Sequence, residues 1–428
     1  MFDAIVARGG AAAATSDDAW LQAMLDAEAA LARALAEARL ISDAEAEAIT
    51  AACHADRFDA AAIAQAATAS GNPVVPLKAA LTDLVEGPAA GHVHRGATSQ
   101  DIVDTATMLV AARALEPLLA DLAAAASAAA ALARRHRDTP MVGRTLLQQA
   151  VPVTFGLKAA GWLAGLENAR RWLVEVRVER LAAQLGGAAG TLASLGDAGP
   201  QVLAAYATAL GLAEPALPWH TLRGRIGELA SALAVVSGAV AKAAQDIVLL
   251  AQTEVAEVRE GEAGGSSTMP HKHNPVAAIC ALGCARQAPG LAATLLGAMA
   301  HEHERAAGAW HAEWRPMSEL LRSTGSAVAW LRQSLESLEV DPERMRANLD
   351  ATGGRLMAER VAAALAGSLG GAEAHRVVAE AALGEDFRAA VADLLTEEEA
   401  EELLDPTGYL GSAGTFVDRA LADHDREG

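Results

Sequence analysis

Residues 264–275 place groups for proton transfer and anion binding within one short, glycine-rich segment. The run reads Gly-Gly-Ser-Ser-Thr-Met-Pro-His-Lys-His-Asn-Pro, and no amphipathic period passes through it. Glycine lets the backbone approach a ligand closely. Ser266 offers a hydroxyl that can serve as nucleophile or base, while Lys272 and Asn274 offer a cation and an amide. These residues predict a ligand-binding loop, and the alternative is a plain turn between helices.

A second polar segment, residues 92–101, leads into a predicted helix. Free N–H groups and the helix dipole make a helix N-terminus a binding place for carboxylates. Thr98 and Ser99 can add hydroxyl donors there, and His94 lies just before them. The alternative is that Ser99 is an ordinary helix cap and His94 a loop histidine.

The chain has a formal net charge of −20, from 34 basic and 54 acidic residues. An acidic surface argues against nucleic acid as a partner, because phosphate binding needs a basic footprint. A site for an anionic substrate must therefore carry its own positive charge. Lys272, Arg144 and Arg305 are candidates for that task.

Three segments of the chain together resemble the motifs of the fumarase/aspartase superfamily. Residues 94–101 match every fixed position of His-x-Gly-x-Thr-Ser-x-Asp. Residues 265–274 match every fixed position of Gly-Ser-Ser-x-Met-Pro-x-Lys-x-Asn. Residues 143–156 match Gly-Arg-Thr-His-x-Gln-x-Ala-x-Pro-x-Thr-x-Gly, except that Leu146 stands where many of these lyases have a histidine.

This resemblance implies roles for the matching residues. Ser266 would transfer the proton at carbon, with Lys272 and loop N–H groups stabilising its alkoxide, and Ser267 is the competing assignment. His94 would bind or polarise the substrate, unless it is a structural histidine. The remaining candidates would hold the substrate and stabilise an enediolate-like intermediate; they are Thr98, Ser99, Arg144, Thr145, Gln148, Asn274 and Arg305.

Leu146 bears on which reaction is catalysed, because leucine can neither donate nor accept a proton. An amine or hydroxyl leaving group benefits from a proton donor. A carboxylate, with a reference pKa of about 4, can leave without one. In reverse, that reaction is the addition of a carboxylate to a conjugated double bond, and its product is a lactone. The chain resembles the branch of the superfamily that does this, the 3-carboxy-cis,cis-muconate cycloisomerases of protocatechuate degradation, over nearly its whole length.

Two alternatives to a cycloisomerase remain open from the sequence. Adenylosuccinate lyases share the three motifs, but their Ser-Ser-x-Glu-Arg run is replaced here by residues 310–314, Trp-His-Ala-Glu-Trp. A catalytically silent structural member of the superfamily is the other alternative. The intact signature loop, with Ser266, Lys272 and Asn274, argues against a silent protein.

The composition predicts an all-α fold. Of the 428 residues, 52% are hydrophobic and only 3% aromatic, which suits long, closely packed helices rather than sheets. We expect helices from Ser16 to Arg39, from Ser99 with a kink or break at Pro117, and across 225–258, 276–306 and 316–338. The predicted regions are an N-terminal domain (1–95), a central long-helix bundle with the signature loop (96–341) and a C-terminal helical domain (342–428).

Cysteine usage and hydropathy bear on the compartment and on cofactors. Three cysteines form no disulfide framework, and an odd number fits a reducing cytosol. No signal peptide is evident, and charge-free apolar runs such as 229–241 are too short for a membrane span, so we expect a cytoplasmic protein without membrane contact. No metal or organic cofactor is expected. The resemblance implies a small-molecule tricarboxylate substrate and a homotetramer with active sites shared between subunits.

Overall fold

A computed structural model describes residues 3–261, 264–265, 269 and 272–427, and its fold is all-α, as predicted. By the contacts between residues, the chain forms two compact units, each built from three separate segments. Unit 1 comprises Met1–Leu122, Ala169–Ala241 and Cys280–Trp330; unit 2 comprises Ala123–Asn168, Lys242–Ile279 and Leu331–Gly428. The division into consecutive regions 1–95, 96–341 and 342–428 stays a prediction.

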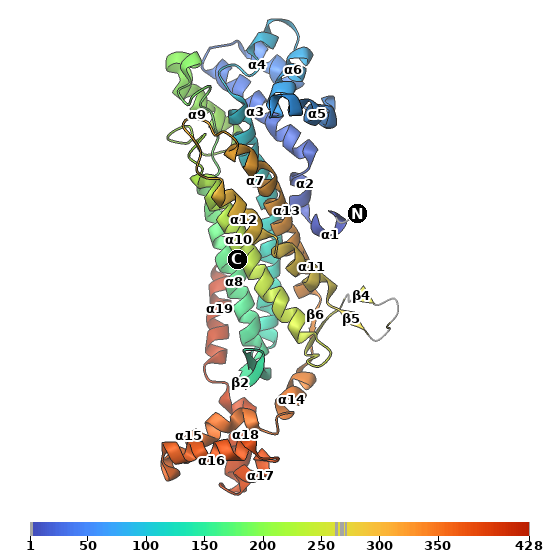
Figure 1. Ribbon diagram of the computed structural model, residues 1–428, viewed down its shortest axis with the longest axis vertical. Helices are drawn as coiled ribbons and strands as arrows, with labels where there is room; N and C mark the ends of the chain where they lie inside the picture. The colour runs from blue at the N-terminus through green and yellow to red at the C-terminus, as the bar shows by residue number, and fades with distance from the viewer. Residues whose placement is uncertain (1–2, 262–263, 266–268, 270–271, 428) are drawn as a thin grey trace. The chain divides into compact units, whose positions relative to one another are not determined.

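Figure 1 labels the elements along the chain. Five helices contribute residues to both units, and the remaining elements belong to one unit each. The five are α7 (Ser99–Arg135), α8 (Phe155–Glu179), α10 (Gly224–Leu250), α11 (Val276–Ala285) and α13 (Ala309–Glu336). Unit 1 also holds α1 (Asp3–Val6), α2 (Gly10–Ala14), α3 (Asp17–Glu37), α4 (Asp43–Ala52), η1 (Ala55–Arg57), α5 (Ala60–Ser70), α6 (Val74–Leu84), η2 (Gly87–His92), η3 (Ala193–Ala198), α9 (Gly199–Leu210) and α12 (Ala288–Gly297). Unit 2 also holds β1 (Pro140–Thr145), β2 (Gln148–Thr154), β3 (Val258–Glu260), β4 (Gly264–Gly265), β5 (His273–Asn274), β6 (Leu338–Val340), α14 (Pro342–Asp350), η4 (Arg355–Met357), α15 (Ala358–Leu369), α16 (Gly371–Leu383), α17 (Phe387–Ala392), α18 (Glu397–Leu404), η5 (Pro406–Tyr409) and α19 (Ala413–Glu427).

In unit 1, α3 starts where the sequence predicts. Ser16 caps it by accepting a hydrogen bond from the N–H of Ala19, and two aspartates occupy its first turn. Leu21, Leu25 and Leu35 are buried on one face, which packs against α4 and α9. This part of unit 1 carries the loop that leads into α7.

Helix α7 runs without interruption from Ser99 to Arg135, so it does not break at Pro117, and a kink there stays a prediction. A proline inside a helix costs about 3 kcal/mol, because it lacks an N–H and its ring crowds the preceding turn. Here the neighbouring Leu115 and Leu118 are fully buried, and their burial outweighs that cost. Gly10 of α2 lies directly against the proline ring, where a β-carbon would approach to 2.6 Å.

Two predicted helices end earlier than their apolar patterns indicate. Helix α10 stops at Leu250 rather than near 258, because Val258–Glu260 instead forms strand β3 and pairs with β6. Helix α12 stops at Gly297 rather than near 306, and His303 adopts a positive φ of 45° in the turns that follow. Helix α13 begins at Ala309, seven residues before the predicted start at Pro316, which it contains.

Unit 2 contains short strands that the helical periodicity does not reveal. Strands β1 and β2 form an antiparallel hairpin, β3 pairs with β6, and β4 pairs with β5. Helix α14 begins at Pro342, and Asp341 caps it by accepting the N–H of Arg344. The hairpin carries the second motif, and the β4–β5 pair closes the signature loop.

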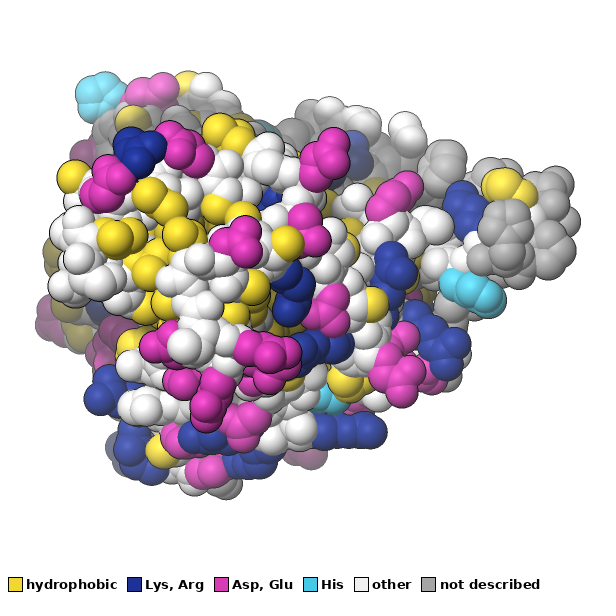
Figure 2. Space-filling view, turned by 90° about the horizontal axis from the view of Figure 1, so that it is seen from below, with side chains coloured by type: hydrophobic (Ala, Val, Ile, Leu, Met, Phe, Trp, Pro, Cys, Tyr) yellow, Lys and Arg dark blue, Asp and Glu magenta, His cyan; other side chains and the backbone are white. Residues whose placement is uncertain are grey.

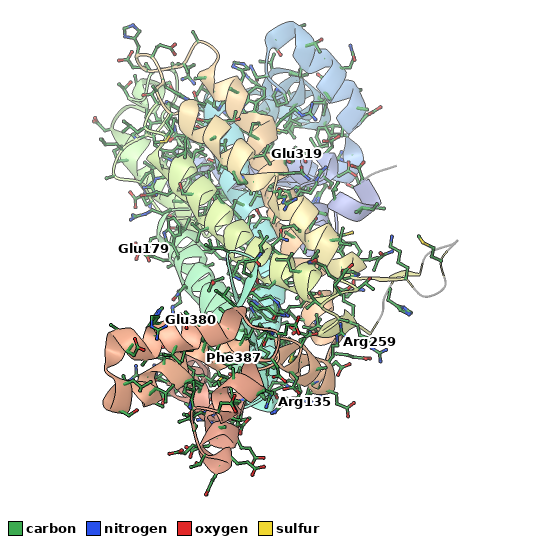
Figure 3. All side chains as sticks on the ribbon, turned by 60° about the horizontal axis from the view of Figure 1, so that its bottom comes forward. Arg135, Glu179, Arg259, Glu319, Glu380 and Phe387 are labelled. Atoms are coloured by element: carbon green, nitrogen blue, oxygen red, sulfur yellow. The ribbon has the colours of Figure 1, made fainter. Side chains whose placement is uncertain are left out.

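The C-terminal helices α15–α18 of unit 2 form a small core of their own. Val361, Phe387 and Val391 are fully buried there, and Phe387 points between the helices (Figure 3). On the face drawn in Figure 2, acidic and basic side chains are interspersed around a hydrophobic area. The exposed pairs of Arg376 with Glu373 and Glu380 are of this mixed kind.

By length and hydropathy alone, three helical segments could cross a membrane, which differs from the sequence-based expectation. They are Ser99–Arg135, Gly224–Leu250 and Val276–Gly297. Of the most apolar window in each, 44%, 44% and 39% of the residues are buried within the chain. The large hydrophobic side chains of these segments that remain exposed are Val235, Val276, Ile279 and Leu296.

Candidate active site

The first motif is held in place by the buried carboxylate of Asp101. This carboxylate accepts hydrogen bonds from the backbone N–H groups of Thr98, Gly186 and Gly187, each at 2.9 Å. Its Oδ1 also lies 2.6 Å from Nε2 of His220, and both side chains are buried. Four N–H or ring nitrogen groups thus converge on one carboxylate, which fixes the backbone at the start of α7.

Ser99 is the first residue of α7 and not its cap, so the capping alternative is wrong. Thr98 occupies the cap position, and its N–H is bound by the carboxylate of Asp101 in the first turn. Within the described structure, the half-buried hydroxyls of Thr98 and Ser99 make no hydrogen bond. Both remain able to bind a carboxylate at the N-terminus of this helix.

His94 is fixed by a carboxylate on a neighbouring helix. Its Nδ1 lies 2.6 Å from Oε1 of Glu28 on α3, and both side chains are almost fully buried. Its backbone has a φ of 63°, in the left-handed region. A carboxylate partner orients an imidazole ring and selects its tautomer. The contact is compatible with both interpretations of His94, the catalytic and the structural.

Asp104, Arg223 and Glu313 form a buried ion cluster behind the first motif. The guanidinium of Arg223 binds Asp104 through both terminal nitrogens, at 2.7 and 3.0 Å, and its Nε donates to Glu313 at 3.0 Å. Burial by itself lowers the pKa of Arg223, but the two carboxylates outweigh it and raise that pKa above its usual value. Trp310 donates its indole N–H to Asp104 at 3.0 Å. The cluster makes a rigid, charged support for the N-terminus of α7.

Arg305, which also belongs to unit 1, contacts the first turn of α7. Its guanidinium donates to Oε1 of Gln100 at 3.1 Å and to the backbone oxygens of Gly187 and Ala188 at 3.2 and 2.8 Å. These contacts join the loop at 187–188 to the first turn of α7. A direct contact of Arg305 with substrate stays a prediction.

The second motif forms the tip of the β1–β2 hairpin in unit 2. Thr145 pairs with Gln148, and both are exposed. The two residues between them, Leu146 and Leu147, have φ values of 51° and 63°, and their side chains are 97% and 76% exposed. Asparagine and glycine are the usual residues for such a turn. Two leucines here present an apolar tip at the position of the missing histidine.

Arg144 is engaged in a structural ion pair. It binds the fully buried Glu257 with both terminal nitrogens, at 2.9 and 2.8 Å, and Asn348 donates to the same carboxylate. Two parallel N–H···O bonds of this kind fix the guanidinium plane. The pair anchors the base of the hairpin, and substrate binding by Arg144 stays a prediction.

The signature loop is closed by two short strands, which lie side by side in Figure 1. Gly264 pairs with Asn274 and Gly265 with His273. Lys272 is exposed, and its backbone N–H donates to the oxygen of Met269 at 3.0 Å. Ser266 and Ser267, the two candidates for proton transfer, lie outside the described residues.

Glu260 binds the N-terminus of α11, the helix that follows the signature loop. Its buried carboxylate accepts the N–H groups of Ala277 and Ala278 at 3.0 and 2.9 Å, at the start of α11. Ser334 donates its hydroxyl to the same carboxylate at 2.6 Å. An acidic side chain at this helix N-terminus satisfies two N–H groups that the helix cannot.

The predicted site residues fall into two groups. Unit 1 brings together His94, Thr98, Ser99 and Arg305 around the start of α7, and unit 2 carries Arg144, Thr145, Gln148, Lys272 and Asn274 on its two hairpins. Four residues hold these groups in place, a role that was not predictable from the motifs: Asp101, His220, Arg223 and Glu257. Only Asp101 lies in a helix, in the first turn of α7, whereas His220, Arg223 and Glu257 lie in connecting segments, where no periodic pattern marks them as buried.

Two of the three cysteines have thiols of raised pKa, and the described residues offer no grouped metal ligands. Burial raises the pKa of the Cys53 thiol to about 12 and that of Cys284 to about 11. Such thiols are poor nucleophiles, because the thiolate is the reactive form. Among the described residues, no three His, Cys, Asp or Glu side chains are grouped so that they could hold a metal ion.

Comparison with known proteins identifies the class. Residues 8–290 match a protein family described as Lyase, and the chain belongs to this family with the all-α fumarase/aspartase fold. It is 49% identical to 3-carboxy-cis,cis-muconate cycloisomerase of Bradyrhizobium diazoefficiens, over 97% of this chain and 96% of the relative. It is 48% identical to nitrosuccinate lyase of Streptomyces davaonensis, over 97% of this chain and 92% of the relative.

Among solved structures, the chain is similar to the 3-carboxy-cis,cis-muconate lactonizing enzyme of Pseudomonas putida. The TM-score is 0.94 at 43% identity, and the match covers 100% of this chain and 99% of that one. These similarities confirm the family that the three motifs indicate.

Proposed function

We propose that this protein is a 3-carboxy-cis,cis-muconate cycloisomerase, which closes its substrate to 4-carboxymuconolactone in protocatechuate degradation. The observation that carries the proposal is similarity over the whole chain to proteins of that name, at 49% identity in sequence and a TM-score of 0.94 in structure. The absence of an acid at the tip of the β1–β2 hairpin supports the same chemistry.

In this reaction a carboxylate oxygen adds to one carbon of a conjugated double bond, and a proton is added to the neighbouring carbon. In reverse, the proton is removed and the carboxylate leaves as a stable anion. A leaving group with a pKa of about 4 needs no proton donor. Leu146, at the position of the family histidine, has none to offer. The apolar tip is therefore compatible with lactone chemistry.

Ser266 is the proposed proton carrier at carbon, with Ser267 as the competing assignment and Lys272 as the nearby cation. Thr98 and Ser99 would bind a substrate carboxylate with their unpaired hydroxyls at the N-terminus of α7. The remaining proposed substrate-binding residues are Arg144, Thr145, Gln148, Asn274 and Arg305, with His94 as a polarising group. Preorganised donors of this kind stabilise the negative charge of an enediolate-like intermediate.

We further infer a cytoplasmic homotetramer in which different subunits contribute the three motifs to each site. Apolar side chains of α10, α11 and α12, among them Val235, Ile279 and Leu296, are exposed within one chain, so a second chain could cover them. A bundle shared between symmetric copies is the common solution for such helices.

A second candidate function is nitrosuccinate elimination, favoured by the 48% identity to a nitrosuccinate lyase. Nitrite, like a carboxylate, is the anion of a moderately strong acid, so its departure would also need no donor at Leu146. Purified protein should therefore be assayed with both compounds in parallel. Loss of the diene absorbance of 3-carboxy-cis,cis-muconate, with the lactone identified by NMR, would support the cycloisomerase. Nitrite release from nitrosuccinate without lactonization would favour the second candidate.

Adenylosuccinate belongs in the same assay as a third compound. Its cleavage would mean that a site without the histidine still runs lyase chemistry on a poor leaving group. Inactivity with all three compounds, combined with thermal stability that ignores added tricarboxylate, would favour a structural protein.

A further inference from the structure

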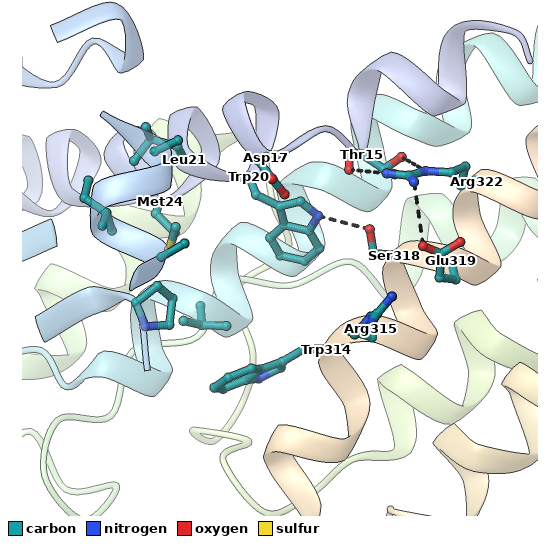
Figure 4. A pocket seen from close by; sticks show the side chains of 15 residues that line it. Thr15, Asp17, Trp20, Leu21, Met24, Trp314, Arg315, Ser318, Glu319 and Arg322 are labelled. Carbon is teal, nitrogen blue, oxygen red and sulfur yellow. Dashed lines mark hydrogen bonds and ion pairs between the residues drawn. The ribbon is translucent and has the colours of Figure 1, made fainter. Parts of the chain in front are cut away.

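Unit 1 contains a cavity of about 620 Å³ that none of the motif residues lines. Residues of helices α3, α5, α7 and α13 line this pocket, which is open to solvent on one side (Figure 4). Ligand pockets are typically cavities of about 300–1,000 Å³ with mostly apolar walls and a few polar groups. By size, this cavity can hold a small organic molecule.

The polar and apolar lining residues lie on different sides. Leu21 and Met24 of α3 lie at one end in Figure 4, while Ser318 and Arg322 of α13 lie at the other. The indole rings of Trp20 and Trp314 line the space as well. A molecule with a flat apolar body and one polar end would match this division, because aromatic rings stack against indoles.

Arg315 lies at the polar end of the cavity, and its guanidinium has no partner among the described residues. The neighbouring Arg322 donates to the backbone oxygen of Thr15 at 3.1 Å and pairs with Glu319 at 3.6 Å, so its charge is balanced. Arg315 makes no hydrogen bond or ion pair with any described residue, and it is exposed. The lining carboxylate of Asp17 belongs to the exposed first turn of α3, where the helix dipole stabilises it.

Two further groups at the cavity can donate a hydrogen bond. Ser318 accepts the indole N–H of Trp20 at 3.3 Å, which leaves its own O–H free to donate. The indole Nε1 of Trp314 is buried without a partner in the described structure.

We propose that this cavity binds an aromatic carboxylate, with the ring between the two tryptophans and the carboxylate at Arg315 and Ser318. A guanidinium binds a carboxylate through two parallel N–H···O bonds, and the hydroxyl of Ser318 supplies one more donor. This site is separate from the motif residues and does not depend on the proposed cycloisomerase activity.

The test uses 2-naphthoate and the uncharged 2-naphthamide as probes with the full-length protein and no substrate. Calorimetry should give one naphthoate per chain with a dissociation constant below about 1 mM, and tryptophan fluorescence should change on binding. The amide should bind about tenfold more weakly, because it lacks the charge-assisted bonds. Equal affinities for the two probes, or no naphthoate binding, would overturn the proposal.

Substitutions in the cavity test whether naphthoate binds there or elsewhere on the protein. Arg315→Gln should weaken naphthoate binding about tenfold without affecting folding, because Arg315 has no partner to lose. Arg33→Gln is the matched control, since Arg33 is another exposed arginine of unit 1 that does not line this cavity. Ala64→Trp should abolish binding by filling the apolar end. Unchanged binding in both cavity variants, or loss of binding in Ser99→Ala, would place the ligand elsewhere.

Discussion

Asp101 and His220 are 119 residues apart in the chain, yet Oδ1 of Asp101 lies 2.6 Å from Nε2 of His220. Both side chains are buried, and the same carboxylate also binds the backbone N–H of Thr98. The contact therefore joins the segment before α10 to the turn that presents Thr98 and Ser99. It makes Asp101 a positioning residue for the first motif.

We predict that Asp101→Asn lowers both stability and turnover. An amide presents an NH₂ group to donors that require an acceptor, and breaking a buried pair costs about 3 kcal/mol in the free energy of unfolding. Displacement of the Thr98–Ser99 turn should lower kcat/KM about a hundredfold. Urea unfolding and the lactonization assay measure the two effects.

The control for this substitution is Asp197→Asn, which changes an exposed aspartate of the same unit. It should leave both quantities unchanged. If Asp101→Asn lowers stability but the folded variant turns over normally, Asp101 supports the fold only and does not position the motif.

Some helix starts were predictable because they depend only on contacts between residues that are close in the sequence. Ser16 caps α3 and Asp341–Pro342 starts α14, each through contacts within a few residues. The helix ends at Leu250 and Gly297 were not predictable in this way. After Leu250, pairing of β3 with the distant strand β6 overrides a helical pattern that continues in the sequence.

In the candidate site, too, some residues were predictable from the sequence and others were not. The motifs predicted the residues that present hydroxyl, amide and cationic groups, because these occur in short runs. The groups that hold them come from far along the chain: Glu257 binds Arg144, and Glu28 binds His94, at sequence separations of 113 and 66 residues. No periodicity connects residues at such separations, so only the structure reveals these pairs.

We predict that acidification destabilises unit 2 through His136. Its side chain is buried, and burial, followed by the charge of Arg135, lowers its pKa below the ordinary value of about 6.5. The unfolded chain then takes up a proton that the folded His136 resists. Its contribution to the free energy of unfolding is complete above about pH 6.5 and is lost as the pH falls through the folded-state pKa.

Urea unfolding between about pH 5 and about pH 8 measures this effect. The decline in stability on the acidic side should be shallower in His136→Gln than in the unmodified protein. His375→Gln, at an exposed histidine of the same unit, is the control and should retain the full slope. An identical slope in all three proteins would assign the pH dependence to other groups.

We predict that Ser266→Ala lowers turnover by about a thousandfold or more, because no other group of the loop would transfer the proton at carbon. Assembly, measured by light scattering, should be unchanged. Ser267→Ala is the matched control, with the same loss of a hydroxyl one residue away. Should Ser267→Ala abolish turnover while Ser266→Ala keeps it, the proton role passes to Ser267.

The final prediction concerns the tip of the β1–β2 hairpin, where Leu146 replaces the family histidine. If the leaving group is a carboxylate, Leu146→His should change the rate of lactonization less than about threefold, because an added acid assists nothing in that step. Leu146 is 97% exposed within the chain, so the substitution should not disturb the hairpin. Leu146→Asn is the control, since it adds polarity without a titratable group. An increase in rate that is specific to histidine and follows its protonation would show that the missing acid limits this enzyme.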